Sequence, residues 1–215
     1  MERTEADEVL YLQLLLDKDP VTRFLAFSAV FEREMIRLLE NENAVPSTEF
    51  ADTVIRTLKD EELMKSCGSM PLLMFESVSD SRFAHEYGKL YSAKQRILRG
   101  IAEKYEDTLR ALYVKYDVSY QADGFEPAVL SAQFKANAVK NLILTILASL
   151  DTPDVHYLIR TQYRNANSAT NRLAALSLYL SSSASDRMEI LLEELARSAE
   201  HPLAFENFIA ASANT

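Results

Sequence analysis

The most hydrophobic part of the chain lies between residues 134 and 150, and its apolar positions have helical spacing. Two rows of apolar residues, each spaced by four positions, would lie side by side on a helix: Phe134, Ala138, Leu142, Ile146 and Leu150 in one, and Val139, Ile143 and Leu147 in the other. Leu144 adds apolar surface on a further side. The pattern predicts a central helix that begins at Pro127 and is covered on several sides by other helices.

Shorter amphipathic segments with start and stop signals precede this helix. Asp19 and Pro20 form a cap and first-turn pair for a helix to about Leu39. The apolar positions expected in its core face are Phe24, Phe27, Phe31, Met35, Leu38 and Leu39. Ser47 can cap the next helix, a short turn ends near Gly68, and Pro71 can start another short helix.

Two long helical stretches are predicted from Asp80, with breaks or bends near Gly88 and Gly100. After the central helix, Thr152 with Pro153 and Ser168 are caps for two further helices. Ser183 and Asp186 resemble a capping box for the next one. A last amphipathic piece, residues 203–211, follows the break at 201–202.

These predictions give an all-α fold. Only 4 Gly and 6 Pro among 215 residues leave little material for the turns of an all-β protein, whereas 48% hydrophobic residues suffice for a large core. Short, evenly spaced helices with tight caps are typical of an α-solenoid of antiparallel helix pairs, of the ARM or HEAT type. No strict repeat period is visible.

The segment from Glu8 to Leu16, EVLYLQLLL, is ambiguous because both of its faces would be apolar in a strand. A helix is equally consistent with the pattern. The segment is therefore left open between a first helix and a residual N-terminal strand.

Charge and cysteine content exclude several classes of function. A net charge of -9 without a stripe of Lys and Arg repels a phosphate backbone, so a nucleic-acid partner is not expected. The apolar run 142–147 is far too short for a membrane span, and the acidic N-terminus does not resemble an export signal. Cys67 is the single cysteine, which favours a reducing, cytoplasmic location.

The candidate metal motif is His85 followed by Glu86. A helical H-E-x-x-H sequence binds zinc through two histidines one turn apart, but Lys89 occupies the position of the second ligand. His156 and His201 lie whole helices away, without a carboxylate or cysteine at ligand spacing. A surface histidine on a helix is therefore the expected role of His85, and no metal site is predicted.

The remaining candidate groups also lack the pattern of a catalytic site. Cys67 precedes a helix-ending glycine and has no histidine nearby in sequence, so we expect a small buried residue. Three pairs of adjacent acids are expected on solvated faces: Glu61 and Glu62, Glu106 and Asp107, and Glu193 and Glu194. No phosphate-binding glycine loop or G-x-S-x-G elbow is present. The sequence predicts no catalytic, cofactor-binding or metal-binding residue.

Four segments of the chain match a known pattern of residues. The matching residues are Asp17, Asp19, Arg23, Phe24 and Ala26 in the first, Val139, Lys140 and Asn141 in the second, Thr170, Ala174, Ala175 and Leu176 in the third, and Glu206 and Phe208 in the fourth. In these segments the chain resembles the C-terminal helical domain of the aminopeptidase N family of zinc metallopeptidases. Phe24 and Phe208 replace tryptophans of the family pattern, and Ser168 and Asn171 replace other polar residues. The resemblance indicates a diverged member, recognised by packing and capping motifs.

The resemblance implies a role without chemistry of its own. In the family, the helical domain caps the active-site chamber and restricts access to peptides with a free N-terminus, while zinc and its ligands belong to a separate catalytic domain. We therefore expect residues 17–215 to be this domain, truncated at its end, after a linker or remnant of a β-domain at 1–16. The expected partners are the catalytic domain of the same parent chain and, through it, peptide substrates.

Two other interpretations follow from the same residues. One is a stand-alone ARM or HEAT-like scaffold that binds another protein along a face of the solenoid. The other is an enzyme complete within these residues, which the survey of candidate groups disfavours. If residues 8–16 are a strand without its sheet, their unpaired edge also predicts dimerisation or disorder of the isolated chain there.

Overall fold

The computed structural model describes residues 6–119 and 126–213, and these residues form helices and no strand. The elements are α1 (Asp7–Leu16), α2 (Pro20–Glu40), α3 (Thr48–Leu58), α4 (Glu61–Cys67), the 3₁₀ turn η1 (Met70–Leu72), α5 (Tyr87–Lys115), α6 (Pro127–Ala148), α7 (Pro153–Asn165), α8 (Ala169–Leu180), α9 (Arg187–Ser198) and α10 (Pro202–Ala213). The predicted all-α class is confirmed. The polar segment 119–124, which the sequence predicts to close the first half of the chain, lies almost wholly outside the described residues.

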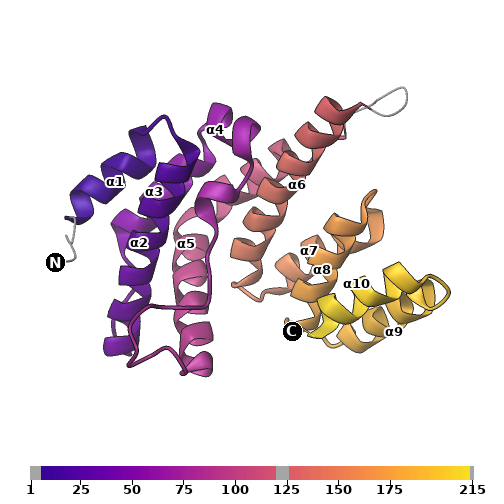
Figure 1. Ribbon diagram of the computed structural model, residues 1–215. Coiled ribbons are helices and arrows are strands. Elements are labelled where there is room, and N and C mark those ends of the chain that lie inside the picture. The colour runs from indigo at the N-terminus through magenta and orange to yellow at the C-terminus, as the bar shows by residue number, and fades with distance from the viewer. Residues whose placement is uncertain (1–5, 120–125, 214–215) are drawn as a thin grey trace. The chain divides into compact units, whose positions relative to one another are not determined.

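The chain forms two compact units, Met1–Lys140 and Asn141–Thr215, with the boundary inside α6. In the first unit, α2 packs against α1, α3 and α5, and α3 also packs against α5 (Figure 1). The rings of Phe27, Phe31 and Phe50 lie 5.7 to 6.0 Å apart between α2 and α3. This aromatic cluster is the core that the spacing of α2 predicted.

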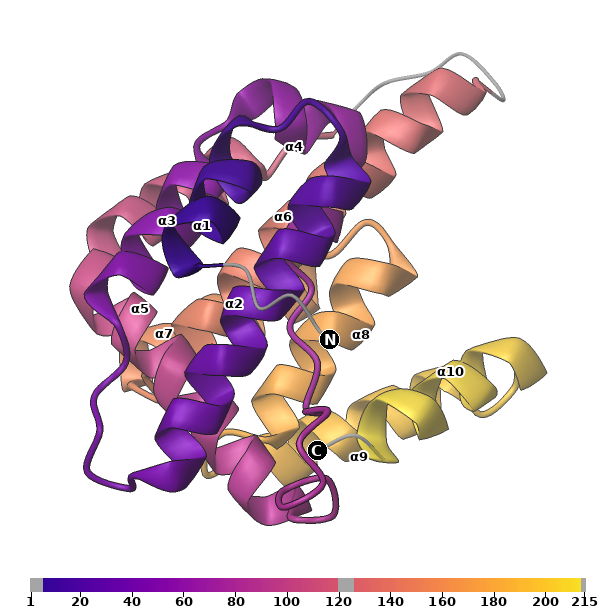
Figure 2. The ribbon, with the colours of Figure 1, turned by 60° about the vertical axis from the view of Figure 1, so that its left-hand side comes forward.

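A segment without regular helix, residues 73–86, connects η1 to α5 and runs alongside α2 (Figure 2). Glu32 of α2 accepts hydrogen bonds from the Ser79 backbone N–H and, at 2.6 Å, from the Ser79 hydroxyl. Arg82 forms an ion pair with Glu40 near the end of the same helix at 2.7 Å. Two side chains of α2 thus hold the 73–86 segment against this helix.

The second unit is a stack of short helices. α7 packs on α8, α8 on α9, and α10 on both α8 and α9. Its core is formed by fully buried apolar residues, namely Ile143, Leu144, Ile146, Leu147, Val155, Ile159, Ala175 and Leu176. Successive helices that pack on their neighbours in the chain are typical of the predicted solenoid.

The predicted caps are mostly confirmed. Asp19, Ser47 and Ser168 each accept a backbone N–H of the helix that follows. The capping box is wrong, because neither Ser183 nor Asp186 caps α9 and the Asp186 carboxylate instead accepts a hydrogen bond from the Tyr179 hydroxyl at 2.5 Å. Thr152 precedes α7 as predicted but makes no side-chain cap.

The ambiguous N-terminal segment is helical, so the strand alternative is wrong. In α1, Leu10 and Leu14 lie one turn apart and are buried, while the helix packs on α2 and α3. Leucine is a good helix former, and docking of one face against α2 selects the helical period. The dimerisation expected from an unpaired strand edge loses its basis.

The break expected near Gly88 matches the start of α5 beside it, after turns rather than a helix, but the break expected near Gly100 is wrong. α5 begins at Tyr87 and continues to Lys115, and its one non-helical residue is Tyr105 (φ -127°, ψ 26°). Gly100 serves close packing instead, because a Cβ built there would lie 2.9 Å from the Cβ and Cγ atoms of the Pro46 ring. The absence of a side chain at Gly100 therefore lets Pro46, in the loop before α3, approach α5 closely.

Burial along the central helix differs from the prediction at its start. Val139, Ile143, Ile146 and Leu147 are fully buried, but Phe134 is 65% exposed. Early in α6 the buried residues are Ala136 and Asn137, which point in other directions from the helix axis than Phe134, so the apolar row extends beyond the buried face. None of the described helices, α6 included, combines the length and the hydrophobicity needed to cross a bilayer.

Candidate functional site

The HEYGK sequence does not form the first part of a helical metal motif. His85 lies in a turn and is exposed, and α5 begins only at Tyr87. Lys89 forms an ion pair with Glu86 at 3.3 Å. The expectation of a surface histidine is confirmed, but its placement on a helix is wrong.

His156 stabilises the turn between α6 and α7. Its Nε2 atom lies 2.6 Å from Asp151 Oδ1, and the same oxygen accepts the Ser183 N–H at 2.9 Å. Burial alone would raise the pKa of the Asp151 carboxyl, but the hydrogen bonds from Ser183 and His156 outweigh it and hold the pKa below its usual value. Asp151 has a positive φ of 51°, which these contacts stabilise at the end of α6.

The other candidate nucleophile and ligand are not part of a site. Cys67 is half-buried at the end of α4, and its thiol lies 3.1 Å from the Leu63 carbonyl oxygen. His201 is exposed in the turn before α10. Within residues 6–119 and 126–213, no three His, Cys, Asp or Glu side chains are grouped so that they could hold a metal ion.

The residues that carry the family resemblance have structural roles. Lys140 is 5% exposed, pairs with Asp117 at 2.5 Å, and lies over the Tyr113 ring at 5.0 Å. The next residue, Asn141, donates to Asn171 Oδ1 at 3.0 Å and accepts from Gln162 at 2.9 Å. The Lys-Asn pair therefore ties α6 to its neighbours within each unit.

The first matching segment has a similar role. The Arg23 guanidinium donates to the Asp17 carbonyl at 2.5 Å and to Asp60 at 2.9 Å, which joins α2 to the cap of α4. Asp19 caps α2, and hydrogen bonds from Thr22 and Val21 lower the pKa of its carboxyl. These motifs position helices rather than a substrate.

The expectation that Glu193 and Glu194 both lie on a solvated face is wrong for Glu194. Its side chain is 3% exposed and accepts hydrogen bonds from the Tyr163 hydroxyl at 2.9 Å and from Arg172 Nε at 3.1 Å. Burial, with this carboxylate as its partner, raises the pKa of the Tyr163 hydroxyl well above its usual value. Adjacent positions on a helix differ by about 100° in direction, so one acid faces the core while its neighbour faces solvent.

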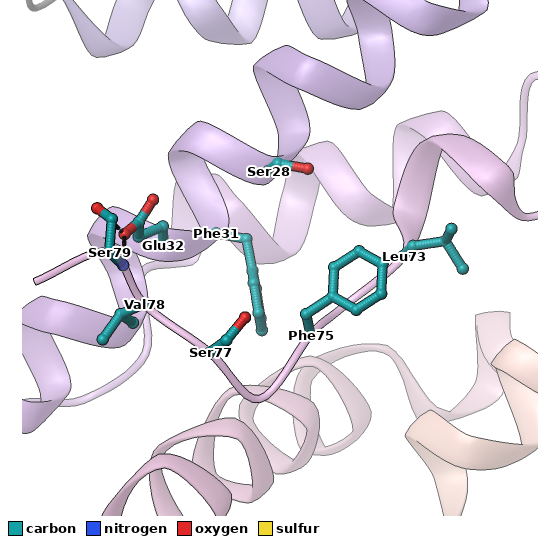
Figure 3. A pocket seen from close by; sticks show the side chains of 8 residues that line it. All are labelled: Ser28, Phe31, Glu32, Leu73, Phe75, Ser77, Val78 and Ser79. Carbon is teal, nitrogen blue, oxygen red and sulfur yellow. Dashed lines mark hydrogen bonds between the residues drawn. The ribbon is translucent and has the colours of Figure 1, made fainter. Parts of the chain in front are cut away.

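One small pocket, about 150 Å³ in volume, lies between α2 and the 73–86 segment. In Figure 3 the Phe31 ring extends from α2 toward the segment, and Leu73, Phe75 and Ser77 come from the segment itself. Glu32 is engaged by Ser79, as the dashed lines show. The pocket contains no arrangement of nucleophile, base and oxyanion donor, so we assign no chemistry to it.

Two helices carry rows of exposed apolar side chains. On α1 the row is Val9, Leu12 and Leu16, which are 44%, 57% and 68% exposed. On α9 it is Met188, Leu192 and Leu195. Contiguous apolar surface of this kind is typical of faces that contact other protein.

Comparison with known proteins shows which family and which solved structure have this fold. A family model described as a domain of unknown function (DUF3458_C), ARM repeats, matches residues 7–215. The crystal structure of Legionella pneumophila aminopeptidase A in complex with aspartic acid matches 99% of this chain with a TM-score of 0.81 and 15% sequence identity. No curated protein sequence matches.

The chain spans 26% of the length of that Legionella aminopeptidase, so the similarity concerns one part of a larger molecule. The family model covers nearly all of the described residues and specifies the repeat type that the helix pattern predicted. The expected ARM-type helical fold is confirmed, and it is similar to the fold of one part of that aminopeptidase. The chain belongs to the DUF3458_C family of ARM-repeat domains.

Proposed function

We propose that this chain is the non-catalytic helical domain of a zinc aminopeptidase, where it caps the active-site chamber and limits access of peptide substrates. The observation that carries the proposal is the fold match, which includes almost the whole chain but only 26% of an aminopeptidase. The parent enzyme removes N-terminal residues from peptides. In this account, zinc is bound by the parent's catalytic domain, which is also this domain's main partner.

Two features support a capping role. The buried side chains of Lys140 and Glu194 each form an ion pair that fixes helix positions, as a rigid wall requires. The exposed apolar row on α1, Val9, Leu12 and Leu16, offers surface for contact with the rest of the parent. The net charge of -9 is consistent with a protein partner rather than nucleic acid, and we infer a cytoplasmic location from the single cysteine.

The proposal predicts that the purified chain has no metal and no peptidase activity of its own. Atomic emission should find far less than one zinc per chain after purification without chelators, and aminoacyl p-nitroanilides should not be hydrolysed above the rate of a heat-unfolded control. The reason is the lack of any ligand cluster among the described residues. Zinc at unit stoichiometry, or hydrolysis that a chelator abolishes, would refute it.

A stand-alone ARM-like scaffold is the alternative, and the apolar row on α9 is compatible with it. The two functions differ in what the gene encodes. A reading frame that also carries H-E-x-x-H with a distal glutamate supports the aminopeptidase domain. A frame without these residues supports the scaffold.

A further inference from the structure

A second pocket lies wholly within the first unit, between α4, the end of α5 and the first half of α6. Its volume is about 290 Å³, and Met64, Val118, Ala132 and Ala136 form an apolar wall. Gly68 lies directly beside it, where a Cβ would come within 3.3 Å of the Lys135 backbone. The helices therefore approach closely at one end and leave a hollow next to that contact.

The charged groups of this pocket are unbalanced. Among the described residues, Lys65, Lys115 and Lys135 line it together with one acid, Glu61. Glu61 pairs with Lys115 at 2.5 Å and with Lys65 at 3.5 Å, which leaves Lys135 without an acidic partner among the described residues. Three lysines and one glutamate among the described lining residues make the pocket cationic, in a chain whose net charge is -9.

Tyr116 provides a second, independent observation. The residue lines the same pocket and is 9% exposed, yet its buried hydroxyl has no hydrogen-bond partner. Burial raises the pKa of this hydroxyl, with Glu61 and Asp60 adding to the effect, so it stays protonated and able to donate. Buried hydroxyls in folded proteins are generally paired, and an unpaired one is a candidate for contact with a ligand.

We propose that this pocket binds a small organic carboxylate with an apolar body, such as the C-terminal residue of a peptide. The carboxylate is held by Lys135 and Lys115, and the Tyr116 hydroxyl, which other protein atoms cover in the structure, donates to it after a small movement of the ring. The apolar body packs on Met64 and Val118. None of the described lining residues is arginine, which together with this apolar wall favours an organic carboxylate over inorganic phosphate.

This site goes beyond the proposed capping function and does not depend on it, because it is complete in the first unit. It can be tested on the chain alone, by following backbone amide NMR shifts during titration. The probes are N-acetyl-leucine, its neutral amide, inorganic phosphate, and the peptide Ala-Ala-Leu with a free C-terminus.

We expect N-acetyl-leucine to give saturable shifts around the pocket with a Kd of about 1 mM or below, and its amide to bind about tenfold more weakly. A peptide that binds about tenfold more tightly than N-acetyl-leucine identifies a peptide C-terminus as the ligand. Equal binding identifies a free acid. Equal shifts for acid and amide, comparable binding of phosphate, or no saturation up to about 20 mM would overturn the proposal.

Variants locate the site. Lys135→Gln should weaken binding at least about fivefold, whereas Lys59→Gln, an exposed lysine outside the pocket that causes the same change in net charge, should leave it unchanged. Ala132→Phe fills the hollow without changing charge and should abolish binding. Unchanged binding by folded Lys135→Gln protein contradicts the assignment. If a variant does not fold, the comparison of N-acetyl-leucine with its amide on the unaltered chain still tests the proposal.

Discussion

Replacing Leu147 by alanine is expected to lower the free energy of unfolding by about 3 kcal/mol. Leu147 is fully buried on α6, beside Ile143 and Ile146 of the same unit. The substitution removes apolar atoms from close-packed surroundings and leaves a cavity that the neighbouring helices fill only in part. Urea unfolding followed by circular dichroism measures the change.

Phe134→Ala is the matched control, since Phe134 belongs to the same sequence pattern on the same helix. Its side chain is 65% exposed, so the expected change is within about 0.5 kcal/mol. Equal losses of stability for the two variants would show that the burial assigned to α6 is wrong.

The second large effect is expected for Glu194→Ala, which should destabilise the chain by about 3 kcal/mol. The substitution leaves the Tyr163 hydroxyl, in a residue 1% exposed, and the half-buried Arg172 guanidinium without their partner. An uncompensated buried charge costs more than the pair contributes when intact. The same unfolding measurement applies.

Glu193→Ala provides the comparison, one position along α9. Its side chain is 31% exposed and pairs with Arg164 and Arg197, whose side chains are 47% and 46% exposed. Ion pairs of this exposure contribute at most about 1 kcal/mol. A loss for Glu193→Ala as large as that for Glu194→Ala would contradict the buried network.

Much of the fold follows from local sequence signals. Asp19, Ser47 and Ser168 cap the helices that the apolar spacing predicted, because a side-chain oxygen at that position satisfies a free backbone N–H whatever the tertiary context. The aromatic spacing of α2 likewise predicted its core face, confirmed by the packed rings of Phe27 and Phe31.

The features that sequence reasoning missed depend on contacts between distant segments. Gly100 was expected to bend a helix. In the structure it instead lets Pro46, more than fifty positions earlier in the chain, pack closely against α5. Glu194 was expected in solvent because it is one of two adjacent acids in the sequence. The contact that buries it comes from Arg172 on another helix, and the sequence around Glu194 does not indicate that contact. Periodicity identifies a helix but not which of its polar residues will meet a partner.

The candidate binding pocket was also invisible in the sequence. Lys65, Lys115 and Lys135 are fifty and twenty positions apart, and each alone resembles an ordinary surface lysine. Only the packing of α4, α5 and α6 brings them to the lining of one pocket. The orphaned Tyr116 hydroxyl has no sequence signal, since tyrosine at core spacing is expected to be paired.

The central claim, that this domain restricts access to an aminopeptidase chamber, is tested most directly on the parent enzyme with and without residues 7–215. The measurement is the ratio of kcat/KM for a long peptide to kcat/KM for a short aminoacyl chromogenic substrate. We predict that deletion raises this ratio while the short substrate is still cleaved. An unchanged ratio in a folded, active deletion variant would contradict the account.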